Sequence, residues 1–215
     1  MRWPTPKILK NFRVTTKKWT DWQWQLANTI KSQADIQKIN QKDFDAMRLT
    51  PYLLSLINFK NKKDPILLQH FPDAREQKKD DFDYNKIWEQ PSDFLDGENR
   101  FIQQKYPDII LLRIANTCHS FCRFCFEKER TLQGKVRTVI TQIQLQNALS
   151  IIKRKKVRQV LLSGGDPLVL TDQSIKNIIE PLAGIPGLKT IRINTRTLLH
   201  NPYRITREFA KMLGT

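Results

Sequence analysis

The sequence predicts an α/β protein in which a helical region precedes a parallel β-sheet. Three short apolar runs, at residues 109–114, 157–162 and 188–193, have the length and composition of buried strands. Each run is followed by a stretch in which apolar residues recur at helical spacing, so strand and helix alternate three times. Strands joined by right-handed crossovers of this kind lie parallel in one sheet.

The first part of the chain, residues 1–100, is predicted to consist of helices and loops. Thr20 precedes an amphipathic stretch and is expected to be the N-cap of a helix. Another helix is expected to begin at Pro51, because proline suits the first helical turn. Its buried side is predicted to be Leu53, Leu54, Leu56 and Ile57.

Two further local patterns complete the description of this region. Ser32 and Asp35 have the spacing of a capping box. The polar stretch 72–85 is expected to be a surface loop. The spacing of apolar residues changes near residue 100. This change predicts a helical region over 1–100 and a sheet-containing part over 101–215.

The crossover helices of the second part are predicted from their apolar spacing. They are expected at residues 142–155, 171–182 and 205–213. In the first, the apolar residues at broadly helical spacing are Ile143, Leu145, Leu149 and Ile152. In the second, one side carries Ile175, Ile178, Ile179 and Leu182.

The composition limits the classes of function. The 215 residues carry a formal charge of +16, with 37 Lys and Arg against 21 Asp and Glu. Such a charge attracts anions and leaves a basic nucleic-acid-binding protein as one alternative, although the basic residues are scattered. Three cysteines cannot all pair, and neither a signal peptide nor a membrane span is recognisable, so a cytoplasmic protein is expected.

The cysteines are concentrated directly after the first predicted strand. Cys118, Cys122 and Cys125 are the only three in the chain, and their spacing is C-x3-C-x2-C. Thiolates are the usual ligands of iron–sulfur clusters. Three of them hold three irons of a [4Fe–4S] cluster and leave the fourth iron open to a small molecule.

Zinc is the rival metal for this loop. A structural zinc site has four ligands, and the chain has no fourth cysteine. His119 adjoins a cysteine and is badly placed to join the same tetrahedron, whereas His70 and His200 are distant in sequence. The ligand count therefore favours iron.

Two more unusual segments follow the other predicted strands. Gly164, Gly165 and Asp166 come after the second strand, and residues 194–196 come after the third. Ligands of parallel sheets bind beyond the carboxyl ends of the strands. We therefore expect the cysteine loop and these two segments to form one cofactor site.

The cysteine spacing after a first strand resembles that of the radical S-adenosylmethionine (SAM) superfamily, and residues 164–166 resemble its "GGE" motif. The resemblance implies that SAM binds the open iron and is cleaved to a 5′-deoxyadenosyl radical. It also implies which residues bind SAM: Phe124 against the adenine, Gly164, Gly165 and Asp166 at the methionine amino group, and Thr195 and Arg196 at the carboxylate.

Further segments make the resemblance narrower. Residues 19–26, 49–57, 106–108, 161–168, 191–196 and 204–206 occur in the order found in lysine 2,3-aminomutase and its relatives. The resemblance begins at about residue 15 and implies a partial (β/α) barrel, of which about three βα units lie in this chain. It further implies an isomerase that moves the amino group of a lysine-like amino acid between adjacent carbons, with pyridoxal phosphate as a second cofactor.

The sequence departs from the family in ways that bear on function. Lys105 and Tyr106 are the residues assigned to pyridoxal phosphate, but Ile109 replaces an arginine expected nearby. Glu127 occupies the position of an arginine that grips the substrate carboxylate, so this position is expected to repel a carboxylate or to face a cation. About 90 residues of the barrel, with the pyridoxal lysine, are not found in the 215 residues, at ~30 residues for each unit.

These departures leave several interpretations open. The chain is a truncated product, one of two chains that together make a barrel, or a piece of a longer protein. The expected partners are an amino-acid or protein-lysine substrate and an electron donor such as flavodoxin or ferredoxin. If two chains together make the barrel, the chain with the other half is a further partner. The alternative to an aminomutase is a remnant that binds the cluster and SAM without that activity. No catalytic residue is predicted.

Overall fold

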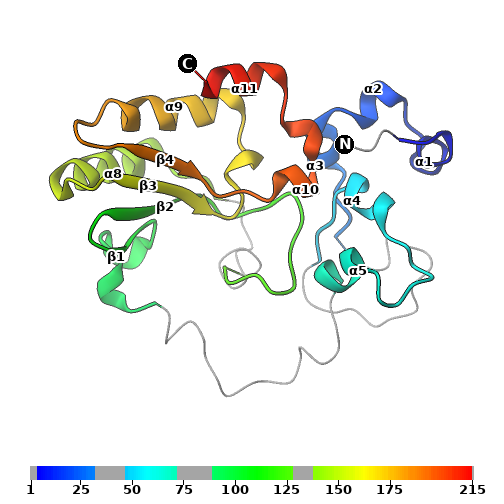
Figure 1. Cartoon of the computed structure of the whole chain (residues 1–215), viewed down its shortest axis with the longest axis horizontal. Helices are drawn as coiled ribbons and strands as arrows, with labels where there is room; N and C mark the ends of the chain where they lie inside the picture. Colours follow the sequence, from blue (N-terminus) through cyan, green and yellow to red (C-terminus); the bar gives the residue numbers. More distant parts are fainter. Residues whose placement is uncertain (1–3, 32–46, 72–88, 128–137, 215) are drawn as a thin grey trace. The chain divides into compact units, whose positions relative to one another are not determined.

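The computed structural model describes residues 4–31, 47–71, 89–127 and 138–214 (Figure 1). Contacts within the chain divide it into two compact units. The helical unit comprises residues 1–78, 119–126 and 196–215, and the sheet unit comprises residues 79–118 and 127–195. The predicted boundary near residue 100 stays a prediction about domain organisation.

The sheet unit contains a four-stranded open sheet in the order β1-β2-β3-β4. The strands are β1 (Ile102–Tyr106), β2 (Ile109–Ala115), β3 (Gln159–Gly164) and β4 (Thr190–Ile193). Strands β2, β3 and β4 are parallel, as the three apolar runs predict, and this confirms the α/β class. β1 pairs antiparallel with β2 and was missed, because Gln-Gln-Lys gives it little apolar signal.

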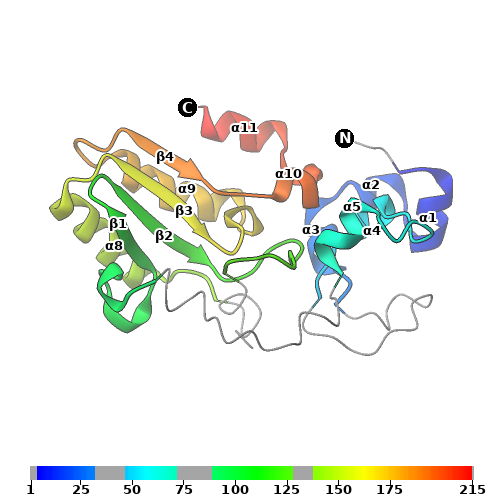
Figure 2. The ribbon, with the colours of Figure 1, turned by 60° about the horizontal axis from the view of Figure 1, so that its bottom comes forward.

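Two helices connect the parallel strands. They are α8 (Gln142–Lys155) and α9 (Asp172–Ala183), and a threonine side chain caps each N-terminus. They contact each other and lie on one face of the sheet (Figure 2). Of the apolar residues at helical spacing in α8, Leu145 and Ile152 are buried, whereas Ile143 is 83% exposed. Ala148 and Ile151 are also buried.

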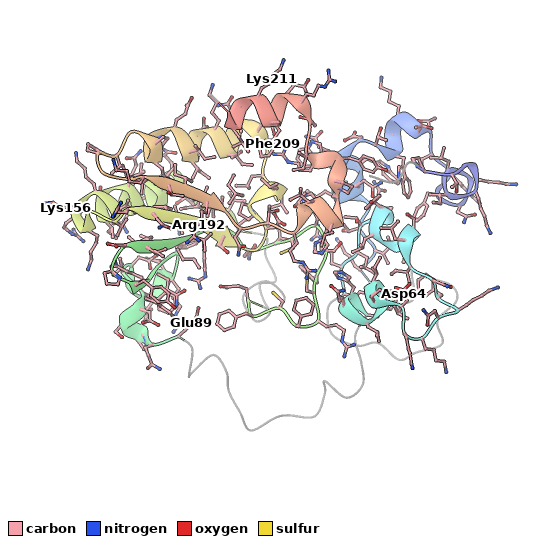
Figure 3. All side chains as sticks on the ribbon, viewed as in Figure 1. Asp64, Glu89, Lys156, Arg192, Phe209 and Lys211 are labelled. Carbon is pink, nitrogen blue, oxygen red and sulfur yellow. The ribbon has the colours of Figure 1, made fainter. Side chains whose placement is uncertain are left out.

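Alternation along the strands gives the sheet two different faces. One face is fully buried and apolar, and it belongs to the side covered by α8 and α9: Ile110, Leu112, Ile114, Val160 and Leu162. The opposite face has a polar row at the carboxyl ends of the strands. Arg113 pairs in register with Ser163, and Ser163 accepts a 3.4 Å hydrogen bond from the Asn194 amide. Arg192, labelled in Figure 3, extends this polar character to β4.

The helical unit consists of short helices. They are α1 (Pro6–Phe12), α2 (Thr16–Trp19), α3 (Trp22–Ala27), α4 (Pro51–Leu56), α5 (Pro65–His70), α10 (Thr197–His200) and α11 (Arg207–Leu213). The helix predicted at 205–213 is confirmed as α11, with Thr206 as its N-cap. This helix is grouped with the helical unit, and its expected place as the third crossover stays a prediction.

Helix α4 begins where proline predicts, and the Thr50 hydroxyl accepts from the Leu53 N–H to cap it. Leu53 and Ile57 are buried in one apolar cluster, and Leu54 and Leu56 pack against it half-buried. The prediction that Thr20 caps a helix is wrong. Asp21 caps α3 instead, because its carboxylate accepts from the backbone N–H groups of Gln23 and Trp24.

Hydrogen bonds join the last segment of the chain to the N-terminal helices. Trp19 donates to the Tyr203 hydroxyl over 3.1 Å, and the Asn201 amide donates to the Trp22 carbonyl over 3.0 Å. The Thr50 hydroxyl donates to the His200 carbonyl. These contacts fix α10 beside α4 within the helical unit.

Some predictions fall on residues that the structure does not describe. The capping box at Ser32 and Asp35 and the surface loop at 72–85 both lie outside the described residues. No helix in the described part of the chain combines the length and the apolar character needed to cross a bilayer.

Candidate metal centre and cofactor site

The three cysteines are thiols rather than disulfide partners, and each is partly exposed. Cys118 is the last residue of the first segment of the sheet unit, 79–118, whereas Cys122 and Cys125 belong to the helical unit. The Cys125 N–H donates to the Cys122 carbonyl over 3.2 Å, so these two residues share a tight turn.

The helical unit holds this turn through backbone hydrogen bonds. The Phe121 N–H donates to the Arg48 carbonyl, and the Arg123 N–H donates to the Gln69 carbonyl. The Arg123 guanidinium also reaches the Leu68 carbonyl over 3.0 Å. The loop that carries Cys122 is therefore built against α5.

Arg196 is directed at the cysteine loop. Its Nη1 lies 2.9 Å from Cys122 Sγ, and its Nη2 donates to the Gln69 side chain over 3.1 Å. The guanidinium carbon lies 5.1 Å from the centre of the Phe124 ring, which is 65% exposed. The structure thus brings together Arg196, Phe124 and one predicted metal ligand.

Gly164, the last residue of β3, and Gly165, which follows it, form a close contact with the end of β2. The Gly165 N–H donates to the Ala115 carbonyl over 2.6 Å, and the Asp166 N–H donates to the Thr117 carbonyl over 2.8 Å. A Cβ on Gly165 would lie 2.2 Å from the Thr117 oxygen. The missing side chain therefore allows the turn to pack against the residue that precedes Cys118.

Asp166 joins this turn to the end of β4. Its carboxylate is buried and accepts from the Leu168 N–H over 2.9 Å and from the Thr195 hydroxyl over 2.7 Å. The predicted SAM residues therefore fall into two groups. Gly164, Gly165, Asp166 and Thr195 lie in the sheet unit, and Phe124 and Arg196 lie in the helical unit.

We expect Thr195→Val to destabilise the protein by about 1–3 kcal/mol, because it removes a hydrogen bond from a buried carboxylate. Urea unfolding measures the change. Thr190→Val is the matched control, since Thr190 is exposed on β4 and its replacement should change the free energy of unfolding by less than about 0.5 kcal/mol. Equal stabilities of the two variants would contradict this role of Thr195.

Lys105 and Tyr106 lie elsewhere on the sheet unit. They end β1 and lie beside Ile109, at the amino end of β2, whereas the cysteine loop follows its carboxyl end. A parallel strand of seven residues is about 20 Å long. Lys105 pairs with Asp93 over 3.4 Å, and Tyr106 is 67% exposed. The structure does not bring these two residues together with the predicted SAM residues of the sheet unit.

Glu127 faces a cation supplied by the chain itself. Arg113 Nη2 lies 2.9 Å from the Glu127 carboxylate and 2.8 Å from that of Glu89. The Gln103 side chain accepts from the same nitrogen over 2.9 Å. The Glu127 carboxylate is thus engaged in a buried ion cluster.

The structure also brings together residues that the sequence separates. His70 ends α5, His200 ends α10, and their rings lie 5.1 Å apart, nearly perpendicular at 79°. With Cys122 they place three potential ligand atoms within 4.8 Å of one another. Sequence reasoning set aside both histidines because of their distance along the chain.

Burial keeps these imidazoles neutral. It lowers the pKa of His200 to about 2, with further lowering by the charges of His70, Arg196 and His119. Burial also lowers the pKa of His70, although a 2.7 Å hydrogen bond with the Phe121 carbonyl opposes this effect. Neutral imidazole is the form that coordinates metals.

His119 has a structural place in the helical unit. It is fully buried, its Nδ1 lies 3.1 Å from the Asn201 amide, and its ring packs edge-on against Trp22. These contacts agree with its interpretation as a loop residue rather than a ligand.

Comparison with known proteins identifies relatives of the chain. Residues 110–201 match the model of a 4Fe-4S single cluster domain. The L-lysine 2,3-aminomutase of Fusobacterium nucleatum is 33% identical over 93% of this chain and 49% of its own length. The Bacillus subtilis enzyme of the same name is 30% identical over 93% of this chain and 44% of its own length. The glutamate 2,3-aminomutase of Clostridioides difficile is 30% identical over 96% of this chain and 51% of its own length.

The chain spans about half the length of the curated relatives that it matches. The matches cover nearly all of this chain and include the cysteine loop, the Gly-Gly turn and the segment after β4. They confirm the resemblance found in the sequence. The chain is therefore a relative of the lysine 2,3-aminomutases, matching about half of their length, and its 4Fe-4S domain supports the radical SAM superfamily.

Proposed function

We propose that this chain carries the cluster-binding and SAM-binding part of a radical SAM aminomutase. The observation that carries the proposal is the C-x3-C-x2-C loop directly after the first parallel strand, inside the region that matches a 4Fe–4S domain. Cys118, Cys122 and Cys125 are the proposed ligands. When bound, the cluster would supply one electron to SAM and so begin radical chemistry.

The residues around the loop suit such a cofactor. Thiolates are the donors that iron–sulfur clusters take, and Arg196 already donates a hydrogen bond to one of them. Hydrogen bonds to cluster sulfurs are a means by which proteins tune the reduction potential. The same guanidinium has further N–H groups that can bind the SAM carboxylate, and the exposed Phe124 ring offers a face to adenine.

The remaining SAM contacts are proposed for the sheet unit. The Gly164–Gly165 turn carries no side chains, so the backbone can approach the methionine amino group. Asp166 and Thr195 hold this turn to the end of β4 and position it. Asp166 is thus a positioning residue for the turn.

We further propose that the sheet is part of a (β/α) barrel. Its parallel strands follow one another in sequence order and both crossover helices lie on one face, as in a barrel wound in one direction. The opposite face, with Arg113, Ser163 and Asn194, would then line the interior. A polar row at the carboxyl ends of the strands suits a substrate with charged groups.

The reaction proposed for the protein is the migration of an amino group between adjacent carbons of an amino acid. Two relatives are named for lysine and one for glutamate, so the amino-acid class follows from the family. Glu127 is engaged with Arg113, which leaves this position without a cation for the substrate carboxylate. A flavodoxin or ferredoxin in the cytoplasm is the proposed electron donor.

Pyridoxal phosphate is the second cofactor that the family implies, and it would supply a carbonyl group for the substrate amine. The Lys105 ammonium is paired with Asp93 and would have to leave that carboxylate to bind the phosphate. The residues described at this hairpin therefore do not form a ready phosphate site, and no role in the reaction is derived for them.

Iron content tests the proposed function. Anaerobic reconstitution is expected to give a brown protein with ~4 irons per chain, the content of one complete cluster. Cys122→Ala removes one of three ligands and should leave less than about one iron, because a cluster held by two thiolates is readily lost. His200→Leu is the control that keeps all three cysteines and should retain wild-type iron. Equal iron in Cys122→Ala and wild type would defeat the proposal.

A further inference from the structure

A buried histidine, His200, lies beside the cysteine loop. His200 is 1% exposed, and neither of its ring nitrogens has a hydrogen-bond partner among the described residues. Leaving a buried polar group unsatisfied costs about 1–3 kcal/mol, so such groups in native proteins call for an explanation. A bound metal ion that accepts a lone pair from a ring nitrogen is one such explanation.

Two further ligand groups converge on this imidazole. His70 Nδ1 bonds the Phe121 carbonyl over 2.7 Å, so this nitrogen carries the hydrogen and Nε2 keeps its lone pair. Metal-binding histidines are commonly oriented by such a bond from the other ring nitrogen to a backbone carbonyl. Cys122 Sγ is the third group, and it is partly exposed.

We propose that His70, His200 and Cys122 bind a divalent transition-metal ion, such as Zn²⁺, in the chain that lacks the cluster. Two imidazoles and a thiolate form a donor set that zinc takes in proteins. Three protein ligands leave the fourth tetrahedral position for water or a small anion. The site goes beyond the proposed function and shares only Cys122 with the proposed cluster.

The spacing of the three groups fits an ion. At bond lengths of ~2.0–2.3 Å, ligand atoms around a tetrahedral ion lie ~3.5 Å apart. The three atoms here lie within 4.8 Å of one another, so shifts on the order of 1 Å close the site. The hydrogen bond from Arg196 to Cys122 Sγ remains compatible with coordination, because sulfur has more than one lone pair.

The shared sulfur gives the site a consequence for the cluster. A metal held by the two histidines and Cys122 occupies a thiolate that iron would need. The chain can therefore be loaded in two ways, and the mononuclear form depends on histidines that the cluster does not use.

Cobalt titration tests this inference. Co²⁺ is added to the full chain, free of iron and kept reduced and without oxygen, and absorption is recorded. We expect one equivalent to bind, with visible bands of tetrahedral Co²⁺ and a near-ultraviolet sulfur-to-cobalt band. Zn²⁺ should displace it. His200→Leu should weaken cobalt binding by about 100-fold or more. Replacing a residue that only orients a metal ligand lowers metal affinity by about 10- to 100-fold, and a ligand itself should matter at least as much.

Matched cysteine variants separate the two sites. Cys122→Ser should remove the sulfur band, whereas Cys118→Ser and Cys125→Ser should keep it. Loss of the band in all three variants, together with no effect of His200→Leu, would mean that the cysteine trio binds cobalt and would overturn the inference.

Two further measurements keep the result interpretable. His200→Leu replaces an unpartnered buried group by an apolar one, so circular dichroism and unfolding should show a folded protein at least as stable as the metal-free wild type. His70→Leu should reproduce its effect on cobalt. If iron loading fails in every variant while the cobalt pattern holds, the proposed function falls and this site stands.

Discussion

Replacing Gly165 with alanine is expected to destabilise the sheet unit by at least about 3 kcal/mol, the upper part of the range for overpacking. The added Cβ would lie 2.2 Å from the Thr117 oxygen and 2.5 Å from its nitrogen. Both atoms are backbone, so no side-chain rotation relieves the contact. The ends of β2 and β3 must separate, and the hydrogen bond from Asp166 to Thr117 must break with them.

Hydrogen exchange and urea unfolding measure this effect. The N–H groups of Gly165 and Asp166 should exchange much faster in Gly165→Ala than in the wild type. Gly184→Ala is the control, because its Cβ would lie 3.7 Å from the nearest atoms at the end of α9. That control should be neutral or more stable by about 0.4–1 kcal/mol. A Gly165→Ala protein as stable as the control would refute the close packing described above.

Arg113→Met is expected to cost about 3–5 kcal/mol, the range for removing one partner of a buried ion pair. Arg113, Glu89 and Glu127 have side chains that are 6%, 3% and 14% exposed. Without the guanidinium, two carboxylates face each other with little water to solvate them. Gln103 also loses the donor that its side-chain oxygen accepts from.

Urea unfolding of Arg113→Met and of a matched control measures this loss. Lys105→Met is the control, since it breaks the more exposed pair with Asp93 and should cost less than about 1 kcal/mol. Equal costs for the two substitutions would show that the cluster around Arg113 contributes no more than a surface pair.

The features that local sequence determines were predicted well. The three apolar runs became β2, β3 and β4, because a parallel strand covered by helices needs continuous apolar residues. The helices expected at residues 142–155, 171–182 and 205–213 formed as α8, α9 and α11. The cysteine loop and the Gly-Gly turn were recognisable because short motifs preserve both residue types and spacing.

The features that depend on tertiary packing were not predictable. His70 and His200 are 130 residues apart, and only the packing of α5 and α10 brings their rings together. The partner of Glu127 was equally hidden, because Arg113 lies on a strand whose apolar neighbours dominate the pattern. The error at Thr20 has a different cause. Thr20 and Asp21 are adjacent and are both of residue types that cap helices, and it is the Asp21 carboxylate that accepts the first N–H groups of α3.

The position of β4 at the edge of the sheet has a consequence for self-association. Among the described residues β4 pairs only with β3, so half of its backbone N–H and C=O groups point away from the sheet. Lys189 and Arg192 place positive charges along this border. Two copies of the chain that meet there repel each other, whereas an incoming strand with acidic side chains is attracted. The charge along this edge therefore discourages edge-to-edge strand pairing between identical molecules and favours extension of the sheet by a segment with acidic side chains.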